Sequence, residues 1–113
     1  MIIIAGSSDF DPAQRATALE AASVLFDATR AQDGCLAYVW CPDPADDARV
    51  WVYERWRDEA SLAVHLAGPC YAGTLKALSG NGLRGADVAK YRIDLSGPVY
   101  DSTMRPRADF FEA

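Results

Sequence analysis

Four stretches of the chain are rich in β-branched and aromatic residues that alternate between two faces, which is typical of β-strands. The first is a short run over residues 2–7. Residues 35–41 and 49–56 flank the turn-forming sequence PDPADDA, so we expect these two strands to form a hairpin. The last predicted strand covers residues 86–95.

The segment between the first two strands has the apolar spacing of a helix. Asp11 is a suitable N-cap, and Pro12 fits the first helical position, where its missing N–H costs nothing. We expect this helix to end near Gln32, because Gly34 can adopt the left-handed conformation that closes a helix. Its apolar stripe consists of Leu19, Ala22, Phe26 and Thr29.

Helical spacing returns after the hairpin. A second helix is predicted over residues 58–67, and it ends at Gly68-Pro69. The spacing of Tyr71, Leu75 and Leu78 then indicates a further short helical segment before the glycine-rich sequence GNGLRG.

The predicted elements follow the order β-α-β-β-α-β, which is that of the ferredoxin-like α+β fold with a four-stranded antiparallel sheet. In this fold the helices lie on one face of the sheet. The two hairpin strands are apolar on both faces, so the other face would be a large interaction surface. A second copy of the sheet is the simplest cover, which predicts a homodimer. The alternative is that the long C-terminal tail covers this face.

Composition and charge narrow the classes of partner. The 113 residues form one globular domain, with 50% hydrophobic and 24% charged residues. The net charge is −5 and Lys and Arg are not clustered, so we expect neither nucleic acid nor an anionic membrane as a partner. No stretch has the pattern of a secretory signal or the length of a membrane span, so we expect a cytoplasmic protein.

Cysteine and histidine usage argues against a bound metal or cofactor. The three cysteines, Cys35, Cys41 and Cys70, lack CxxC spacing, so reduced thiols are expected and not a disulfide framework or a zinc site. One histidine and scattered acidic residues give no metal-ligand spacing, and the glycine-rich sequence has no lysine-bearing phosphate loop.

Four short motifs occur in order along the chain. They are Gly34-Cys35 before an aromatic strand, Glu54-Arg55-Trp56 at a strand end, His65-Leu66 on a helix, and Pro69. In this order and spacing they resemble the antibiotic biosynthesis monooxygenase domain family, whose members are small dimeric α/β-barrel proteins of the ferredoxin-like type. The resemblance covers about residues 1–96. It leaves residues 97–113 as a tail that is either extended or docked on the partner subunit.

The resemblance implies a cofactor-independent monooxygenase that oxidises a small aromatic or phenolic substrate with dioxygen. In such members the deprotonated substrate is its own source of electrons, and the protein supplies an apolar pocket with polar groups that favour the anion. Two alternatives remain open: a dimeric ligand-binding or stress-related module without turnover, and an isomerase or lyase of a small metabolite.

Two residues are the candidates for catalysis. His65 shares a helix face with Leu62 and Leu66, so we expect it to point toward the sheet, where a neutral imidazole can take a proton from a phenol. The alternative is a buried histidine that is bound to a backbone carbonyl or a carboxylate. Trp56 matches the tryptophan of the family's pocket, and it forms either a wall for an aromatic ligand or part of the core.

Four further residues are the candidates for substrate binding. Glu54 shares an apolar strand face with Trp56, so burial should raise the pKa of its carboxyl group and make it a candidate acid or base. The alternative is that Glu54 is hydrogen-bonded or paired with an arginine such as Arg57 near the strand end. The other three candidates combine an aromatic ring with a hydroxyl group, and they are Tyr38, Tyr53 and Tyr71, the last at the pocket mouth.

Overall fold

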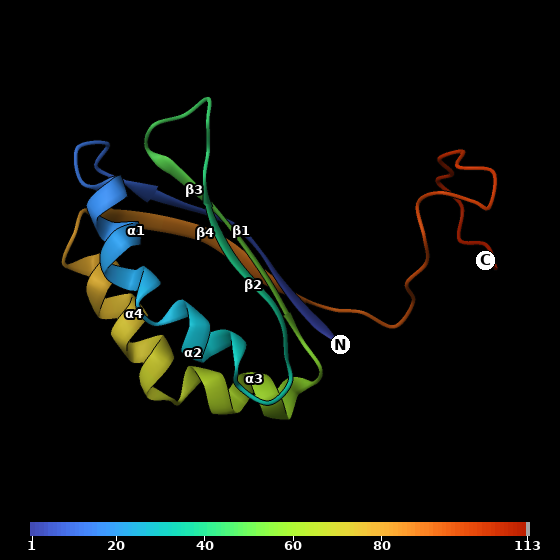
Figure 1. Ribbon diagram of the computed structural model, residues 1–113, viewed down its shortest axis with the longest axis horizontal. Helices are drawn as coiled ribbons and strands as arrows, with labels where there is room; N and C mark the ends of the chain where they lie inside the picture. The colour runs from blue at the N-terminus through green and yellow to red at the C-terminus, as the bar shows by residue number, and fades with distance from the viewer. Residues whose placement is uncertain (113) are drawn as a thin grey trace.

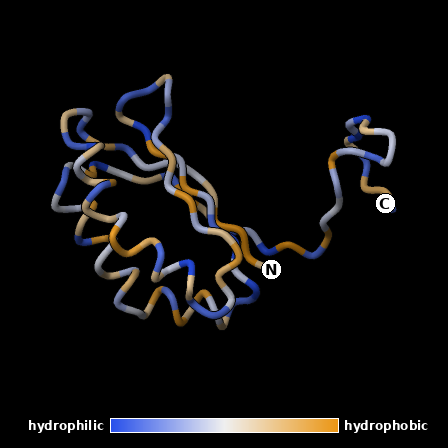
Figure 2. The backbone as a smooth tube through the Cα atoms, in the orientation of Figure 1, coloured by the Kyte–Doolittle hydropathy of each residue, from blue (hydrophilic) through white to orange (hydrophobic). Residues whose placement is uncertain are grey.

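Four antiparallel strands form the single sheet of this computed structural model, which describes residues 1–112. The strands are β1 (Ile2–Phe10), β2 (Cys35–Pro42), β3 (Arg49–Trp56) and β4 (Leu83–Arg92), in the spatial order β2-β3-β1-β4. The expected hairpin of β2 and β3 is present, and the ferredoxin-like prediction is confirmed. Hydrophobic segments run along these strands and recur on the helices (Figure 2).

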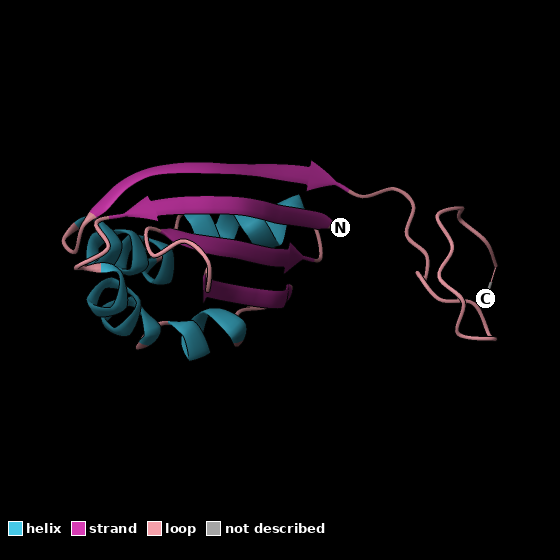
Figure 3. Cartoon of the chain, turned by 90° about the horizontal axis from the view of Figure 1, so that it is seen from above, coloured by secondary structure: helices cyan, strands magenta, loops and turns pink. Residues whose placement is uncertain are grey.

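Four helices lie together on one face of the sheet (Figures 1 and 3). They are α1 (Arg15–Ser23), α2 (Phe26–Arg30), α3 (Glu59–Leu66) and α4 (Pro69–Ser79). The region predicted as one helix before β2 holds two, α1 and α2, whereas α3 and α4 correspond to the two segments predicted after the hairpin. The segment expected as a short helical piece is α4, which at 11 residues is the longest of the four.

The prediction of one helix from Asp11 to Gln32 was wrong. Asp11 instead makes a turn, in which its carboxylate accepts a hydrogen bond from the Ala13 N–H (3.0 Å), and α1 starts only at Arg15. A break after Ser23 separates α1 from α2. The break places the Phe26 ring against the sheet, with its centroid 5.6 Å from that of Tyr38. A continuous helix would keep regular backbone hydrogen bonds but would lack the contact between Phe26 and Tyr38.

The last strand also differs from the prediction of residues 86–95. It begins earlier, because Leu83 pairs with Phe10 across an irregularity in the ladder. It ends at Arg92, which pairs with Ile2, the first residue of β1, and one further backbone hydrogen bond joins the Ile93 N–H to the Met1 carbonyl at 2.9 Å. The extent of β1 therefore determines where β4 begins and ends.

Glycine allows β1 and β4 to approach at the centre of the sheet. Gly6 has a positive φ of 154°, and a Cβ atom built on it would lie 2.1 Å from the Asp87 carbonyl oxygen. A residue with a side chain could not keep this backbone path. Gly6 therefore fixes the close pairing of β4, which carries one wall of the cavity described below.

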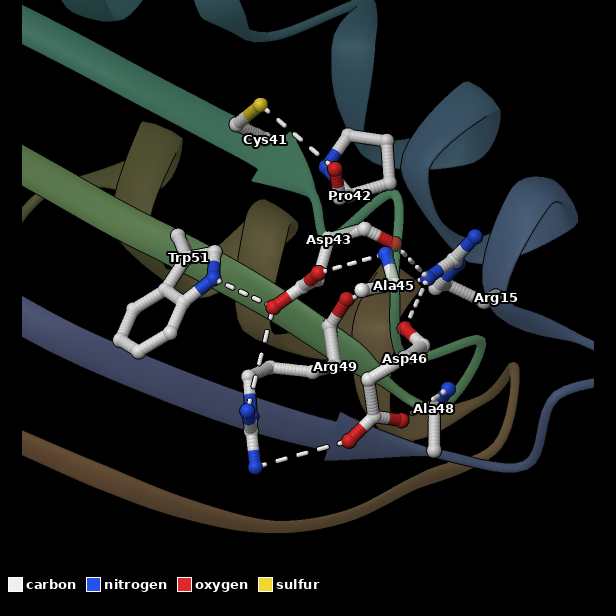
Figure 4. Close-up of polar contacts among 9 residues, drawn as sticks. All are labelled: Arg15, Cys41, Pro42, Asp43, Ala45, Asp46, Ala48, Arg49 and Trp51. Atoms are coloured by element: carbon white, nitrogen blue, oxygen red, sulfur yellow. Dashed lines mark hydrogen bonds and ion pairs between the residues drawn. The ribbon is translucent and has the colours of Figure 1, made fainter.

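Arg15 holds the turn between β2 and β3 (Figure 4). One of its guanidinium nitrogens, Nη1, donates to the backbone carbonyls of Asp43 (3.2 Å), Asp46 (2.8 Å) and Arg49 (3.1 Å). Trp51 Nε1 donates to the Asp43 carboxylate at 2.8 Å on the other side of the turn. These contacts tie α1 to the hairpin and fix the direction of β3.

The two faces of the sheet have different surroundings. Residues Val50, Val52, Glu54 and Trp56 alternate toward the helices and are buried. The opposite face has no helix over it, and four of its large apolar side chains are 40–53% exposed. We call this the open face, and these side chains are Val39, Trp51, Tyr53 and Tyr91.

After β4 the chain leaves the body of the molecule (Figures 1 and 3). This C-terminal arm, residues 93–112, has a turn of its own, in which the Asp101 carboxylate accepts from the N–H groups of Thr103 (2.9 Å) and Arg105 (3.1 Å). Five of its apolar side chains are more than half exposed, and they are Leu95, Val99, Tyr100, Met104 and Phe110. Residue 113 of the predicted tail lies outside the described residues.

No helix within residues 1–112 has both the length and the apolar character that a membrane crossing requires.

Candidate functional site

A cavity of about 330 Å³ lies between the sheet and the pair α3 and α4. All four strands contribute to its walls, and most of the lining side chains are apolar. Its mouth lies between β4 and the helices, because Val88 and Lys90 on one side and Leu66, Tyr71 and Leu75 on the other are exposed. The polar residues of the lining are Ser8, Tyr38, Trp40, Glu54, His65, Tyr71, Thr74 and Lys90. This volume suits a small organic molecule.

The start of α3 determines where His65 points. Asp58 caps the helix, with its carboxylate accepting from the Ser61 N–H at 2.8 Å. From this start, Leu62 and His65 face the sheet, as their spacing predicts, and His65 is only 2% exposed. The imidazole stacks on Trp56 at 4.6 Å between ring centroids. His65 thus forms part of the cavity wall and also packs against the core residue Trp56.

Gln32 holds the imidazole of His65. The Gln32 amide oxygen lies 2.7 Å from Nδ1, and an oxygen at this position favours the tautomer with its proton on Nδ1 and a lone pair on Nε2. Burial lowers the pKa of His65, which keeps the ring neutral at physiological pH. For a buried His65 the expected partner was a backbone carbonyl or a carboxylate. The partner found is the side-chain amide of Gln32. Because the Gln32 amide is uncharged, burial is the effect that shifts the pKa of His65.

Glu54 is buried on the same wall. It is 7% exposed, its Oε1 accepts from Trp56 Nε1 at 3.0 Å, and burial raises the pKa of its carboxyl group. The alternative pairing with Arg57 does not occur, because Arg57 binds Asp33 and Asp58 on the surface. Trp56 is fully buried and contacts Glu54 and His65 from behind, so it is not among the lining residues.

The predicted tyrosines are divided between the two faces of the sheet. Tyr38 and Tyr71 both line the cavity, and their rings meet His65 edge-on at 5.9 and 5.8 Å. Burial raises the pKa of Tyr38 to about 12, so this phenol stays protonated and can donate a hydrogen bond. Tyr53 lies on the open face, where it pairs across the strands with Val39 and Ala5, and does not join the cavity.

Five polar residues that line or support the cavity were not foreseen as site residues: Ser8, Gln32, Trp40, Thr74 and Lys90. Gln32 is 33 positions from His65, so no local spacing links the two. Lys90 does have a signal, because it alternates with Ala89 and Tyr91 along β4 and so had to face the helices once β4 was paired with β1. Thr74 and Trp40 carry no sequence signal that separates them from core residues.

Metal binding has no site among the described residues. Within residues 1–112 no three His, Cys, Asp or Glu side chains are close enough to hold an ion.

Together the fold and the cavity define a ferredoxin-like α+β domain with an aromatic-lined pocket beside a neutral histidine. Residues 1–77 match the family described as antibiotic biosynthesis monooxygenase. The chain belongs to this family. The matched segment contains Glu54, His65 and Thr74, and it ends before β4.

Solved structures show the same fold. A candidate antibiotic biosynthesis monooxygenase from Deinococcus radiodurans superposes with a TM-score of 0.79 at 22% identity, covering 89% of this chain and 100% of its own. Rv0793 from Mycobacterium tuberculosis gives 0.74 at 18% identity, with coverages of 86% and 98%. These identities establish the fold and not the activity.

One relative by sequence is an uncharacterized protein of Synechocystis sp., 24% identical over 70 residues. The match covers 62% of this chain and 48% of that protein, so this chain spans about half the length of the relative.

Proposed function

We propose that the protein is a cofactor-independent monooxygenase that oxidises a small phenolic or anthrone-like substrate with dioxygen. The observation that carries this proposal is His65, whose neutral ring lines an apolar cavity with Nδ1 bound to Gln32. This arrangement leaves Nε2 as the proton acceptor. Family membership supports the reaction class, and the aromatic lining of the cavity supports the substrate class.

The first step would be proton transfer from the substrate to His65 Nε2. A base with a pKa somewhat below neutral is unprotonated at physiological pH and is therefore ready to accept. The stacked Trp56 ring stabilises the imidazolium that forms, because an aromatic face attracts a cation. Tyr38 and Tyr71 lie edge-on to His65, where their rings can hold a planar substrate.

The second step would be electron transfer from the substrate anion to dioxygen. Recombination at the substrate carbon forms a C–O bond and a peroxide, and loss of water then leaves a carbonyl. A methylene group and one O₂ thus give one carbonyl and one water, with the substrate supplying all four electrons. The protein contributes the base and an apolar enclosure, in which the anion is not stabilised by bulk water.

His65→Ala tests the base. Oxygen uptake with hydroxylated naphthalenes and anthrones should fall about a hundredfold or more, which is typical of the loss of a general base. The residual activity should no longer depend on pH near the pKa of the histidine. In the wild type, kcat/KM should be constant at neutral pH and decline only below about 6.5, because burial lowers the pKa of His65.

Val64→Ala is the matched control, since Val64 neighbours His65 on α3 but is 71% exposed. This variant should keep full activity. A His65→Ala protein that is folded, binds the substrate and consumes oxygen at the wild-type rate would contradict the proposal. Substrate binding without any oxygen uptake by the wild type would favour a ligand-binding module instead.

We also propose that the protein is a homodimer that pairs the open faces of two sheets. Val39, Tyr53, Ala5 and Ala89 form one row across all four strands of this face. A sheet of this size offers each partner roughly the 800 Å² that stable complexes bury. The C-terminal arm would dock on the partner subunit, because its apolar side chains have no cover on their own protomer.

A further inference from the structure

Two buried polar atoms in the cavity wall have no hydrogen-bond partner among the described residues. They are Trp40 Nε1 on β2 and Thr74 Oγ1 on α4. Thr74 is 3% exposed. Buried polar groups are nearly always paired, and each exception in a native protein calls for a cause. Both residues line the cavity, which is where a ligand would supply the partner.

The two atoms act in the same part of the cavity. The Tyr38 and Trp40 rings are 6.4 Å apart, and the side chains of Trp40 and Thr74 both lie beside the Tyr38 hydroxyl, where their polar contacts with it moderate the rise that burial causes in its pKa. The two polar groups are therefore close to one another. The Tyr38 hydroxyl is the polar group beside them, but neither contact with it has the distance and angles of a formed hydrogen bond.

The chemistry of the pair selects the ligand atom. An indole N–H can only donate, so the atom opposite Trp40 must be an acceptor. A threonine hydroxyl can donate to the same atom, since a carbonyl oxygen has two lone pairs. We propose that Trp40 and Thr74 form a subsite for a neutral carbonyl oxygen of the ligand. This inference rests on the proposed function, because it places the substrate in the same cavity as His65.

Charge favours a neutral carbonyl over a carboxylate. The only Lys or Arg among the described lining residues is Lys90 on β4. The strand order β2-β3-β1-β4 places β4 at the opposite edge of the sheet from Trp40, about 14 Å away. The nearer charged group is Glu54, whose negative charge acts on the Tyr38 hydroxyl and would repel an anion there. The ligand should thus place its carbonyl at Trp40 and Thr74 and its acidic proton at His65.

Calorimetric titration with two matched probes tests the subsite. One probe is a hydroxytetralone, which has a phenol and a ketone, and the other is the tetrahydronaphthol that keeps the phenol and lacks the ketone. The wild type should bind the ketone about tenfold or more tightly than the tetrahydronaphthol. Trp40→Phe and Thr74→Val should each weaken ketone binding about fivefold to tenfold, the usual effect of one hydrogen bond, and leave the other probe unchanged.

Thr74→Ser is the conservative control, because it keeps the hydroxyl and should retain the preference for the ketone. The melting temperature gives a second readout. Thr74→Val removes an unpaired buried hydroxyl at nearly constant volume, so it should melt at the same temperature as the wild type or higher. A lower melting temperature would mean that the hydroxyl has a structural partner, and would overturn the subsite.

Equal affinity of the wild type for the two probes would also overturn the subsite, whatever the protein catalyses. Failure of both probes to bind would overturn the subsite and the aromatic cavity together. A ketone preference that is lost in Trp40→Phe and Thr74→Val would establish the subsite even if no oxygen is consumed. In that case only the proposed monooxygenase activity would be wrong.

Discussion

Burial acts in opposite directions on the two titratable side chains that meet Trp56. It lowers the pKa of His65 and raises the pKa of Glu54, because in both cases it disfavours the charged form. Each group therefore tends toward neutrality in the cavity wall. The lowered pKa keeps His65 available as a base. The raised pKa of Glu54 means that its ionised form at neutral pH lowers the free energy of unfolding.

Glu54→Gln should stabilise the protein at neutral pH. The pKa of Glu54 is raised in the folded state, so its favourable contribution is present below about pH 4.5 and is lost as pH rises through the folded-state pKa. Glutamine keeps an oxygen that can accept from Trp56 Nε1. We expect a gain of about 1 kcal/mol in the free energy of unfolding at pH 7, measured by urea denaturation.

The gain should shrink as the pH is lowered to 4, because the wild-type carboxyl group is then protonated as well. Glu20→Gln is the control, since Glu20 is exposed on α1 and should show no change. A Glu54→Gln protein that is less stable than the wild type at pH 7 would show that the carboxylate is needed in its ionised form.

Individual positions were predictable only where a local pattern determined them. The inward orientation of His65 and Glu54 follows from helical and strand periodicity, and the structure shows both buried. The Gln32 contact joins two segments that are 33 residues apart, and the unpaired state of Trp40 and Thr74 depends on the whole cavity. Such features arise from tertiary packing, which single-sequence patterns do not encode.

Among the secondary-structure elements, β4 depends most on its neighbour. It is an edge strand that is paired only with β1, and Gly6 allows the two backbones to approach. The prediction from the sequence started β4 three residues too late, because periodicity does not reveal where a partner strand begins and ends. The break between α1 and α2 was missed for a similar reason, since the Phe26–Tyr38 contact is made across elements.

Gly6→Ala should destabilise the protein by at least about 2 kcal/mol. A Cβ at this position meets the Asp87 carbonyl oxygen at 2.1 Å, and the backbone has a φ that L residues avoid. Guanidinium denaturation monitored by circular dichroism measures the effect. Gly85→Ala is the control in β4, because nothing lies within 4 Å of its added methyl group. Equal stabilities for the two variants would contradict the tight β1–β4 pairing.

At the scale of the whole fold, residues 1–112 leave two apolar surfaces uncovered, the open face of the sheet and the C-terminal arm. Monomeric proteins seldom expose contiguous apolar surface of this kind. A second copy would cover both surfaces at once if each arm docks on its partner. The alternative is that the arm folds back over its own sheet, but the arm instead extends away from the body (Figure 1).

Tyr53→Glu should convert the dimer into folded monomers. Tyr53 is 40% exposed at the centre of the open face, where a pair of buried charges across a two-fold axis is strongly unfavourable. Sedimentation equilibrium measures the change in mass. Val64→Glu places the same charge on an exposed position of α3 and should leave the dimer intact.

A chain truncated after Ser96 separates the contributions of sheet and arm. It should still dimerise, but with a larger dissociation constant, because the contacts of the arm are lost. A truncated chain with unchanged dimer affinity would exclude docking of the arm. A wild-type protein that sediments as a monomer would exclude both parts of the assembly.

The family match ends at residue 77, whereas the wall of the cavity formed by β4 begins at Leu83. The proton acceptor and the proposed carbonyl donors lie within the matched segment, whereas the β4 side of the entrance lies beyond it. Substitutions along this edge strand would therefore change which molecules enter and leave the reacting groups in place. A screen for the substrate should accordingly hold the phenol and the ketone constant and vary the substituents that would pass Val88 and Lys90.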